Sequence, residues 1–93
     1  MKKASGPATL YQITVTRSAR KQLLQIPDKA KAAIQAAIGA LATDPRPSGV
    51  KKLKGQEGYR IRVGDYRILY SIFDNILLVE VVKVGQRGNF YDE

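Results

Sequence analysis

Twelve residues, YRIRVGDYRILY (Tyr59–Tyr70), constrain the possible fold more than any other part of the chain. Apolar and basic residues alternate on both sides of Gly64-Asp65, and a dipeptide of this kind favours a β-hairpin with a two-residue turn. Such a turn fixes the register of the hairpin and places Arg62 directly opposite Arg67. Because paired residues project from the same side of a sheet, this segment predicts one apolar face and one basic face.

The apolar face of the hairpin is expected to form the core under helices, and the basic face is expected to stay open. The core face collects the side chains of Tyr59, Ile61, Val63, Tyr66, Ile68 and Tyr70. The basic face collects those of Arg60, Arg62, Arg67 and Leu69. Like charges opposite each other destabilise a sheet, so three arginines on one face indicate an anion that binds between them.

A further strand is expected after a turn at Asp74-Asn75. The apolar segment Ile76–Val84 continues the alternation, which predicts Leu77 on the core face and Glu80 in the row of Arg60 on the basic face. One carboxylate in that position can neutralise one arginine but not three. The basic face therefore indicates anion binding rather than a merely solvated surface.

A strand and a short helix are predicted before the hairpin. The alternating segment Leu10–Thr16 predicts a first strand. Thr16 or Ser18 can then cap a helix that ends near Gln25, just before Pro27. The side chains expected to face inward from this helix are Ala19, Leu23 and Leu24.

The second helix is predicted from Asp28, a suitable N-terminal cap, to about Thr43. Its apolar residues recur at helical spacing and form a packing stripe of Ala30, Ile34, Ala37, Ile38 and Leu41. Gly39 inside this helix costs roughly 1 kcal/mol relative to alanine, and its presence predicts a close crossing with another element.

The order of elements is β-α-α-β-β-β, with a loop DPRPSG and a short strand in VKKLKG before the hairpin. Strands joined by short turns run antiparallel. The chain is therefore predicted to be an α+β domain with an N-terminal strand, an αα-hairpin and an antiparallel sheet of three to four strands with one open face. Residues 1–9 are expected to be a flexible lead-in, and residues 10–93 a single domain.

The composition excludes several kinds of chemistry. The 93 residues include no cysteine and no histidine, which removes disulfides, thiolate metal sites and the commonest general base. No cofactor and no metal site are expected, because the carboxylates show no ligand spacing. No apolar run approaches the roughly 18 residues of a membrane span, and no signal peptide is visible, so a cytoplasmic protein without membrane contact is expected.

The positive charge favours a polyanionic partner. Sixteen Lys and Arg residues against eight Asp and Glu give a net charge of +8. Guanidinium groups suit phosphate, because their planar fork donates paired hydrogen bonds. Basic residues outside the hairpin are expected to converge on its basic face, namely Lys51, Lys52, Lys54 and Arg87.

A face of this kind can bind nucleic acid passively, or it can cleave RNA. Cleavage by attack of the ribose 2′-hydroxyl on the adjacent phosphate needs a base, cationic stabilisation of the phosphorane and an acid for the leaving oxygen. Arginine can stabilise the phosphorane but cannot act as the base. Without histidine, the base must come from another group, and Lys52, Lys54 and Tyr91 remain candidates.

At these positions the chain resembles a known family. The segment VKKLKG, the hairpin GYRIRVGDYRILY and the terminal VVKVGQRGNFY resemble the RelE toxins of prokaryotic type II toxin–antitoxin modules, over nearly the whole chain from about Leu10. The resemblance implies a metal-independent mRNA interferase that enters the ribosomal A site, cuts mRNA there and so inhibits translation. It also implies a fold similar to microbial ribonucleases and a cognate antitoxin that wraps around the toxin with an acidic or amphipathic segment.

The resemblance also implies a set of catalytic residues, which by position are Arg60, Arg62, Arg67, Arg87 and Tyr91. The lysines expected to bind RNA phosphates are Lys51, Lys52 and Lys54. The chain departs from the family in two places: both residues of its basic pair are arginine where founding members have lysine, and Gln86 stands where many relatives have histidine. Two alternatives stay open. A ParE-like toxin would share the fold and poison DNA gyrase, and a non-catalytic module would only bind nucleic acid.

Overall fold

The computed structural model describes residues 10–55 and 57–86 of the chain. Its elements follow in the predicted order, as β1 (Gln12–Val15), α1 (Arg17–Leu24), α2 (Asp28–Ala40), β2 (Lys51–Lys52), β3 (Tyr59–Val63), β4 (Tyr66–Phe73), the 3₁₀ turn η1 (Asp74–Ile76) and β5 (Leu78–Gln86). Residues 1–9, expected to precede the domain, lie outside the described part. Within that part, no helix is long and apolar enough to cross a membrane.

The strands of the described residues form one sheet in the order β1-β5-β4-β3-β2. The strands after the helices pair with one another in antiparallel fashion, as predicted. The N-terminal strand β1 joins the same sheet at the far edge and runs parallel to β5. A parallel pair needs a long crossover connection, and the chain from α1 to β4 provides it.

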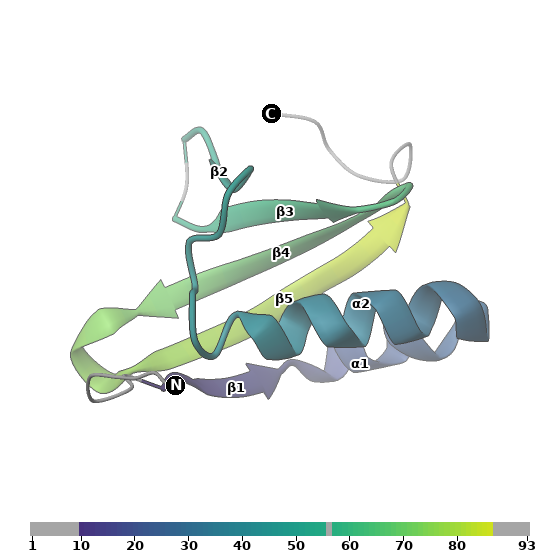
Figure 1. The fold of residues 1–93 in the computed structure, drawn as a ribbon, viewed down its shortest axis with the longest axis horizontal. Helices are drawn as coiled ribbons and strands as arrows, with labels where there is room; N and C mark the ends of the chain where they lie inside the picture. The colour runs from purple at the N-terminus through teal and green to yellow at the C-terminus, as the bar shows by residue number, and fades with distance from the viewer. Residues whose placement is uncertain (1–9, 56, 87–93) are drawn as a thin grey trace.

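Both helices lie on one face of this sheet (Figure 1). Thr16 caps α1 as predicted, because its Oγ1 accepts a hydrogen bond from the backbone N–H of Ala19 at 3.1 Å. Ala19 is fully buried, and Leu23 packs against the core. Leu24 was predicted to face inward and instead is 70% exposed. At about 100° per residue it lies about 140° around the helix from Ala19, whereas Leu23 lies only about 40° from it.

The apolar stripe of α2 forms the helical side of the core, as its spacing predicted. Ile34, Ile38 and Leu41 are buried, and Ala30 and Ala37 pack against them. Replacing one such buried isoleucine by alanine lowers the free energy of unfolding by about 2 to 5 kcal/mol in most proteins. The contacts of this stripe with the sheet therefore hold the two layers together.

The ends of α2 and its glycine differ from the prediction. Pro27 precedes the first turn and the Asp28 side chain does not cap it, and the helix ends at Ala40 rather than near Thr43. The predicted close crossing at Gly39 is also wrong. Gly39 is exposed, and among residues 10–55 and 57–86 no other element lies within 4 Å of the position that its Cβ would take.

The β3–β4 hairpin has the predicted register at every position. The pairs are Tyr59 with Tyr70, Arg60 with Leu69, Ile61 with Ile68, Arg62 with Arg67 and Val63 with Tyr66. On the helix side, Ile68 and Tyr70 are completely buried. Gly64 at the turn has a φ of 59°, a conformation that residues with a Cβ rarely adopt. The turn dipeptide thus sets the register on which the rest of the sheet depends.

The connection from β4 to β5 is longer than the predicted two-residue turn. η1 is followed by Leu77 in the left-handed region, with a φ of 53°. β5 therefore begins at Leu78 rather than Ile76. Leu77, predicted on the core face, is 40% exposed.

A β-bulge interrupts β5. Leu69 pairs with Lys83 and its neighbour Tyr70 pairs with Val81, so Val82 is an extra residue in β5. Because alternation has a period of two, one extra residue exchanges the faces of the two halves of a strand. The buried side chains of β5 accordingly change phase at the bulge: Val79 and Val81 are buried before it, and Val84 is buried after it.

Candidate nucleic-acid site

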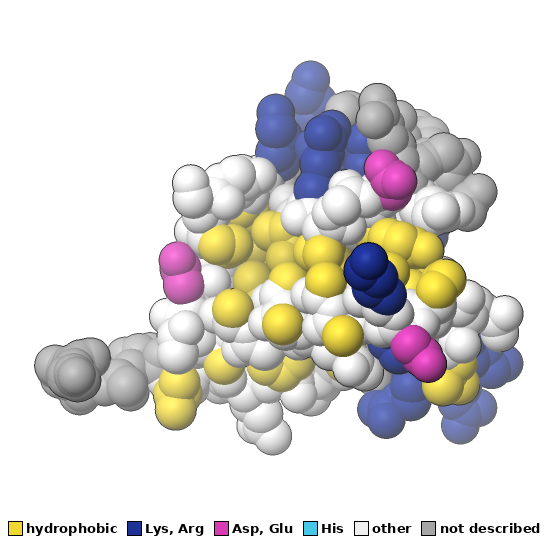
Figure 2. Space-filling model, turned by 45° about the vertical axis from the view of Figure 1, so that its right-hand side comes forward, with side chains coloured by type: hydrophobic (Ala, Val, Ile, Leu, Met, Phe, Trp, Pro, Cys, Tyr) yellow, Lys and Arg dark blue, Asp and Glu magenta, His cyan; other side chains and the backbone are white. Residues whose placement is uncertain are grey.

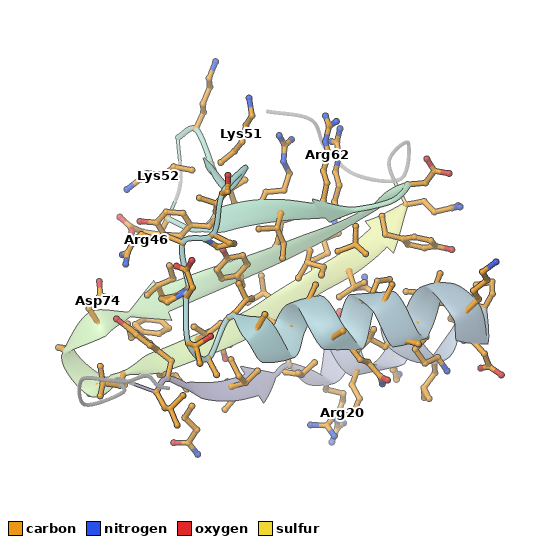
Figure 3. All side chains as sticks on the ribbon, in the orientation of Figure 1. Arg20, Arg46, Lys51, Lys52, Arg62 and Asp74 are labelled. Carbon is orange, nitrogen blue, oxygen red and sulfur yellow. The ribbon has the colours of Figure 1, made fainter. Side chains whose placement is uncertain are left out.

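Three arginines of the β3–β4 hairpin share the sheet face that lies away from the helices. Arg62 pairs with Arg67, and Arg60 pairs with Leu69. On the other side of Arg67, β5 contributes Gly85, which adds no side chain to this face. Figure 3 shows Arg62 pointing away from α1 and α2. Arginine stays protonated in proteins, so the register places like charges side by side.

The three arginines differ in exposure, which the sequence did not predict. Arg62 is exposed, whereas Arg60 and Arg67 are only 7% and 4% exposed. The basic face is therefore not uniformly open. Electrostatic interactions strengthen where water is excluded, so an anion that reaches the two enclosed guanidiniums would interact with them more strongly than with an exposed one.

The carboxylate that was expected among these arginines lies in another row. Arg60 pairs with Leu69, and the residue of β5 that pairs with Leu69 is Lys83. Glu80 pairs with Ser71 instead. The predicted position of Glu80 is wrong because the connection from β4 to β5 is longer than the predicted turn, so that Phe73 pairs with Leu78 rather than with Ile76. The extra residue Val82 then brings Lys83 opposite Leu69. The row of Arg60 thus gains a cation in place of an acid.

β2 divides the clustered lysines between two faces. Lys51 pairs with Arg60, whereas Lys52 pairs with Tyr59, and the Nζ of Lys52 lies 5.8 Å from the centre of that ring. Figure 3 shows the two lysines pointing in different directions. Because successive side chains of a strand alternate between faces, Lys51 joins the arginines and Lys52 does not. Lys54 follows the strand and is exposed.

Two of the predicted catalytic residues, Arg87 and Tyr91, lie outside the described residues. β5 ends at Gln86, which pairs with Tyr66 next to the hairpin turn. The described part of the site therefore consists of Arg60, Arg62, Arg67 and Lys51.

A groove of about 690 Å³ lies between α2 and β3, beside this site. Its apolar walls include Ala37, Leu41 and Ile61, and its basic rim includes Lys51 and Arg62. β2 pairs with β3 only up to Arg60, so it leaves the following residues of β3 at the edge of the sheet. Clefts that bind ligands commonly enclose about 300 to 1,000 Å³, so this one is large enough for part of a partner.

A polar cluster fixes the loop that leads from α2 to β2, and sequence reasoning did not identify it. The Arg46 guanidinium donates to both carboxylate oxygens of Asp74, at 3.3 and 2.9 Å, and its Nε donates to the Tyr59 hydroxyl at 3.4 Å. The Tyr11 hydroxyl donates to Asp74 Oδ1 at 2.6 Å. Figure 3 shows Arg46 and Asp74 at the same end of the sheet. The one signal in the sequence is an arginine held between two prolines in DPRPSG.

The hydrogen bonds of this cluster shift the titration of its members. Those from Arg46 and Tyr11 lower the pKa of the Asp74 carboxyl, and the bond to Asp74 raises the pKa of Tyr11. Burial raises the pKa of Tyr70, whose hydroxyl donates to the Pro45 carbonyl at 2.7 Å. These residues surround the loop rather than the arginines, so we assign them a structural role.

Comparison with known proteins now identifies the family. Residues 13–91 match the family described as "ParE toxin of type II toxin-antitoxin system, parDE". The chain belongs to the RelE/ParE superfamily of toxins. Toxin RelE of Mycobacterium tuberculosis is 31% identical to this toxin over 83 residues, which cover 87% of this chain and 86% of the relative. The predicted membership in a type II toxin–antitoxin family is confirmed.

Solved structures agree with this assignment. The toxin–antitoxin complex RelBE2 from Mycobacterium tuberculosis superimposes with a TM-score of 0.75 at 30% identity, covering 87% of this chain and 95% of that one. The RelE–RelB complex from Pyrococcus horikoshii gives 0.77 at 26% identity, covering 87% and 99%. These similarities confirm the predicted RelE-like α+β fold, and both relatives were solved together with an antitoxin.

Proposed function

We propose that this toxin is a ribosome-dependent mRNA interferase that cuts mRNA in the A site by attack of a ribose 2′-hydroxyl on the adjacent phosphate. The observation that carries the proposal is the pairing of Arg62 with Arg67, with Arg60 and Lys51 in the adjoining row. Cations in neighbouring rows repel one another, and a bound phosphate relieves that repulsion. The RelE name of the 31% identical relative supports the same activity.

The difference in exposure suits the three arginines to different roles. The exposed Arg62 is suited to the first contact with an RNA phosphate, and the enclosed Arg60 and Arg67 are suited to the charge that develops on the phosphorane. Positioning of the 2′-hydroxyl by the ribosome would supply part of the barrier lowering, since good orientation is worth up to roughly 7 to 11 kcal/mol. No step of this reaction calls for a metal ion.

The proton must be taken by another group. Lys52 lies across from Tyr59 on the opposite face, which leaves Lys54 and Tyr91 as the better candidates for the base. Arg87 and Tyr91 keep the catalytic roles that the family resemblance implies. Because the substrate is mRNA on ribosomes, we expect the toxin to act in the cytoplasm.

We further propose that a cognate antitoxin neutralises the toxin through an acidic or amphipathic segment. The groove beside β3 combines apolar walls with the basic rim of Lys51 and Arg62, and this combination suits such a segment. A segment bound there would lie next to the sheet face that carries Arg60, Arg62 and Arg67, here called the arginine face. The complexes of the two structural relatives with antitoxins support this kind of partner.

Poisoning of DNA gyrase is the second candidate function, because the matching family is described as ParE toxins. A gyrase poison has no need for paired arginines around a scissile phosphate, so the arginine face favours the nuclease. A passive nucleic-acid-binding module would bind the same anions without arresting growth.

The experiment that decides among these functions measures mRNA cleavage on programmed ribosomes beside gyrase-dependent DNA breakage. We expect cut mRNA and intact DNA, with cleavage reduced at least tenfold in Arg62→Ala, an estimate for the loss of one charged hydrogen bond of about 1.5 to 3 kcal/mol. Lys2→Ala removes one cation at the N-terminal end of the sequence and serves as the matched control. Broken DNA with intact mRNA would assign the toxin to gyrase poisoning, and binding without either reaction would leave the passive module.

A further inference from the structure

A second group of basic residues lies on the αα-hairpin, far from the arginine face. Residues 17–31 contain five cations and one carboxylate, a net charge of +4 out of the +8 of the whole chain. Figure 2 shows dark-blue side chains at the top and at the lower right of the surface, with apolar side chains and a separate dark-blue side chain between them. In Figure 3, Arg20 lies at the opposite border of the molecule from Lys51 and Arg62. One short stretch of RNA in the arginine site cannot account for both groups.

The cations of α1 occupy a single side of the helix. Arg17, Arg20 and Lys21 are spaced i, i+3 and i+4, which places them within roughly 100° of arc. All three are exposed, and Ala19 on the opposite side is completely buried. The helix thus presents one side to the core and, to solvent, a side that carries these three cations around the exposed Leu24.

This placement is unfavourable for the helix on its own. Arg17 is the first residue of α1, where the positive end of the helix dipole disfavours a cation, and the first turn contains no acidic residue. Like charges at i, i+3 and i, i+4 add mutual repulsion. In α2, Lys31 approaches Asp28 at 3.9 Å, but the Asp28 side chain is fully exposed, so the pair is weak. A bound polyanion would relieve all of these repulsions.

From these observations we infer that the αα-hairpin binds the phosphate backbone of folded RNA, through Arg17, Arg20, Lys21, Lys29 and Lys31. The inference rests on the proposed function, in which the toxin acts inside the ribosome and is surrounded by RNA. The arginine face takes the strand to be cut, and the helical face takes structured RNA on the opposite side of the toxin. Such contacts are sequence-independent and fix position rather than specificity.

An acidic protein segment is the competing occupant of this surface. A groove of about 360 Å³ between the helices contains the exposed Leu24 and could hold apolar side chains, but of the five cations it includes only Arg20 and Lys31. The other three, Arg17, Lys21 and Lys29, lie outside it. A ligand that contacts all five cations needs negative charges spread along its own surface, as RNA has, more than it needs an apolar side chain for the groove.

Arg17 and Lys21 make the cleanest test. Within residues 10–55 and 57–86 neither side chain forms an ion pair or a hydrogen bond, whereas Arg20 donates to the Val15 carbonyl at 3.5 Å. The variant R17Q/K21Q therefore removes two charges and keeps helix-compatible side chains. K2Q/K3Q carries the same charge change outside the hairpin, and Leu24→Ser alters the apolar groove alone.

The measurement is the salt dependence of binding to three probes. These are 70S ribosomes with 2′-deoxy sugars at the A-site codon, a 16-base-pair RNA duplex and poly-L-glutamate. We expect R17Q/K21Q to reduce the slope of log K against log salt by roughly 1.5 for both RNA probes, since each phosphate contact contributes roughly 0.7 to 0.9. Affinity at 100 mM salt should fall by roughly tenfold or more. K2Q/K3Q and Leu24→Ser should behave as wild type.

The outcomes separate this inference from the proposed function. If R17Q/K21Q binds both RNA probes like wild type, or K2Q/K3Q loses as much, the inference is overturned. It is also overturned if Leu24→Ser weakens binding while the charge variant does not, or if only poly-L-glutamate responds, because an acidic protein is then the occupant. A loss confined to the duplex, with no ribosome binding by wild type, would support the RNA-binding hairpin and reject the ribosome-dependent function.

Discussion

The two Nη atoms of Arg46 lie 3.3 and 2.9 Å from the two carboxylate oxygens of Asp74 and thereby join the loop before β2 to the turn before β5. The guanidinium also lies 5.2 Å from the centre of the Tyr59 ring. These contacts hold the chain just upstream of Lys51, a residue of the proposed phosphate site. The geometry of the site therefore depends on a pair of residues that does not touch it.

Asp74→Ala should lower stability at neutral pH and remove an acid-sensitive part of it. The pKa of this carboxyl is lowered in the folded protein below its ordinary value of about 3.8, so the unfolded chain binds the proton more readily. The stabilisation is therefore complete above that ordinary value and is lost as the pH falls through the lower folded-state pKa. Urea midpoints of wild type and Asp74→Ala between pH 7 and 2.5 should differ at pH 7 and converge at acid pH. The exposed Glu57→Ala is the control, and a gap that stays constant with pH would contradict the prediction.

Tyr70→Phe should destabilise the fold by about 1 to 2 kcal/mol, because it leaves the Pro45 carbonyl without its buried hydrogen bond. Tyr70 is completely buried, so water cannot replace the lost donor. Tyr66→Phe removes a hydroxyl from a partly buried tyrosine of the same strand and should cost less. Urea unfolding of both variants checks the difference, and equal losses would refute the assigned role of the bond.

Gly39→Ala should stabilise the toxin by roughly 0.5 to 1 kcal/mol. Gly39 is helical and exposed, and the new methyl group would meet no other element of the described part of the chain within 4 Å. Gly64→Ala is the opposite case, since its φ of 59° disfavours a Cβ, and we expect a loss of about 1 to 2 kcal/mol. Thermal unfolding should shift upward for the first variant and downward for the second. A destabilised Gly39→Ala would mean that α2 makes a contact absent from the structure.

Lys51→Gln should reduce mRNA cleavage more than Lys52→Gln does. The two residues are adjacent and carry the same charge, but the register directs Lys51 toward Arg60 and Lys52 toward Tyr59. Loss of one phosphate contact of about 1 kcal/mol corresponds to roughly a fivefold fall in kcat/KM. Cleavage rates on programmed ribosomes should differ between the variants by about that factor. Equal losses would indicate that net charge, rather than the face of the sheet, controls cleavage.

The hairpin register could be predicted residue by residue because a two-residue turn and strict alternation leave one solution for Tyr59–Tyr70. The bulge was missed, although VEVVKV contains its signal: the apolar positions change phase between Val81 and Val82. The longer connection from β4 to β5 was missed as well, and this connection is what moves Glu80 out of the row of Arg60. The error in the site therefore came from two local irregularities, the longer connection before β5 and the bulge within it.

Other features depend on tertiary contacts that no local pattern encodes. The enclosure of Arg60 and Arg67 and the opposite directions of Lys51 and Lys52 follow from packing and from a strand of only two residues. The cluster around Arg46 joins segments as far apart as Tyr11 and Asp74, which are 63 positions apart. The family resemblance predicted the fold correctly and implied a catalytic set, but it could not predict this cluster.

The parallel pairing of β1 with β5 delays the completion of the fold during synthesis. The Thr16 hydroxyl that caps α1 also donates to the Val82 carbonyl, 66 positions further along the chain. At about 5 to 20 residues per second, several seconds separate the emergence of these two partners. In that interval the nascent helices have no sheet to pack on, because β3, β4 and β5 are still being made. A newly synthesised copy therefore completes the described sheet only late in its own translation, when β5 inserts between β1 and β4.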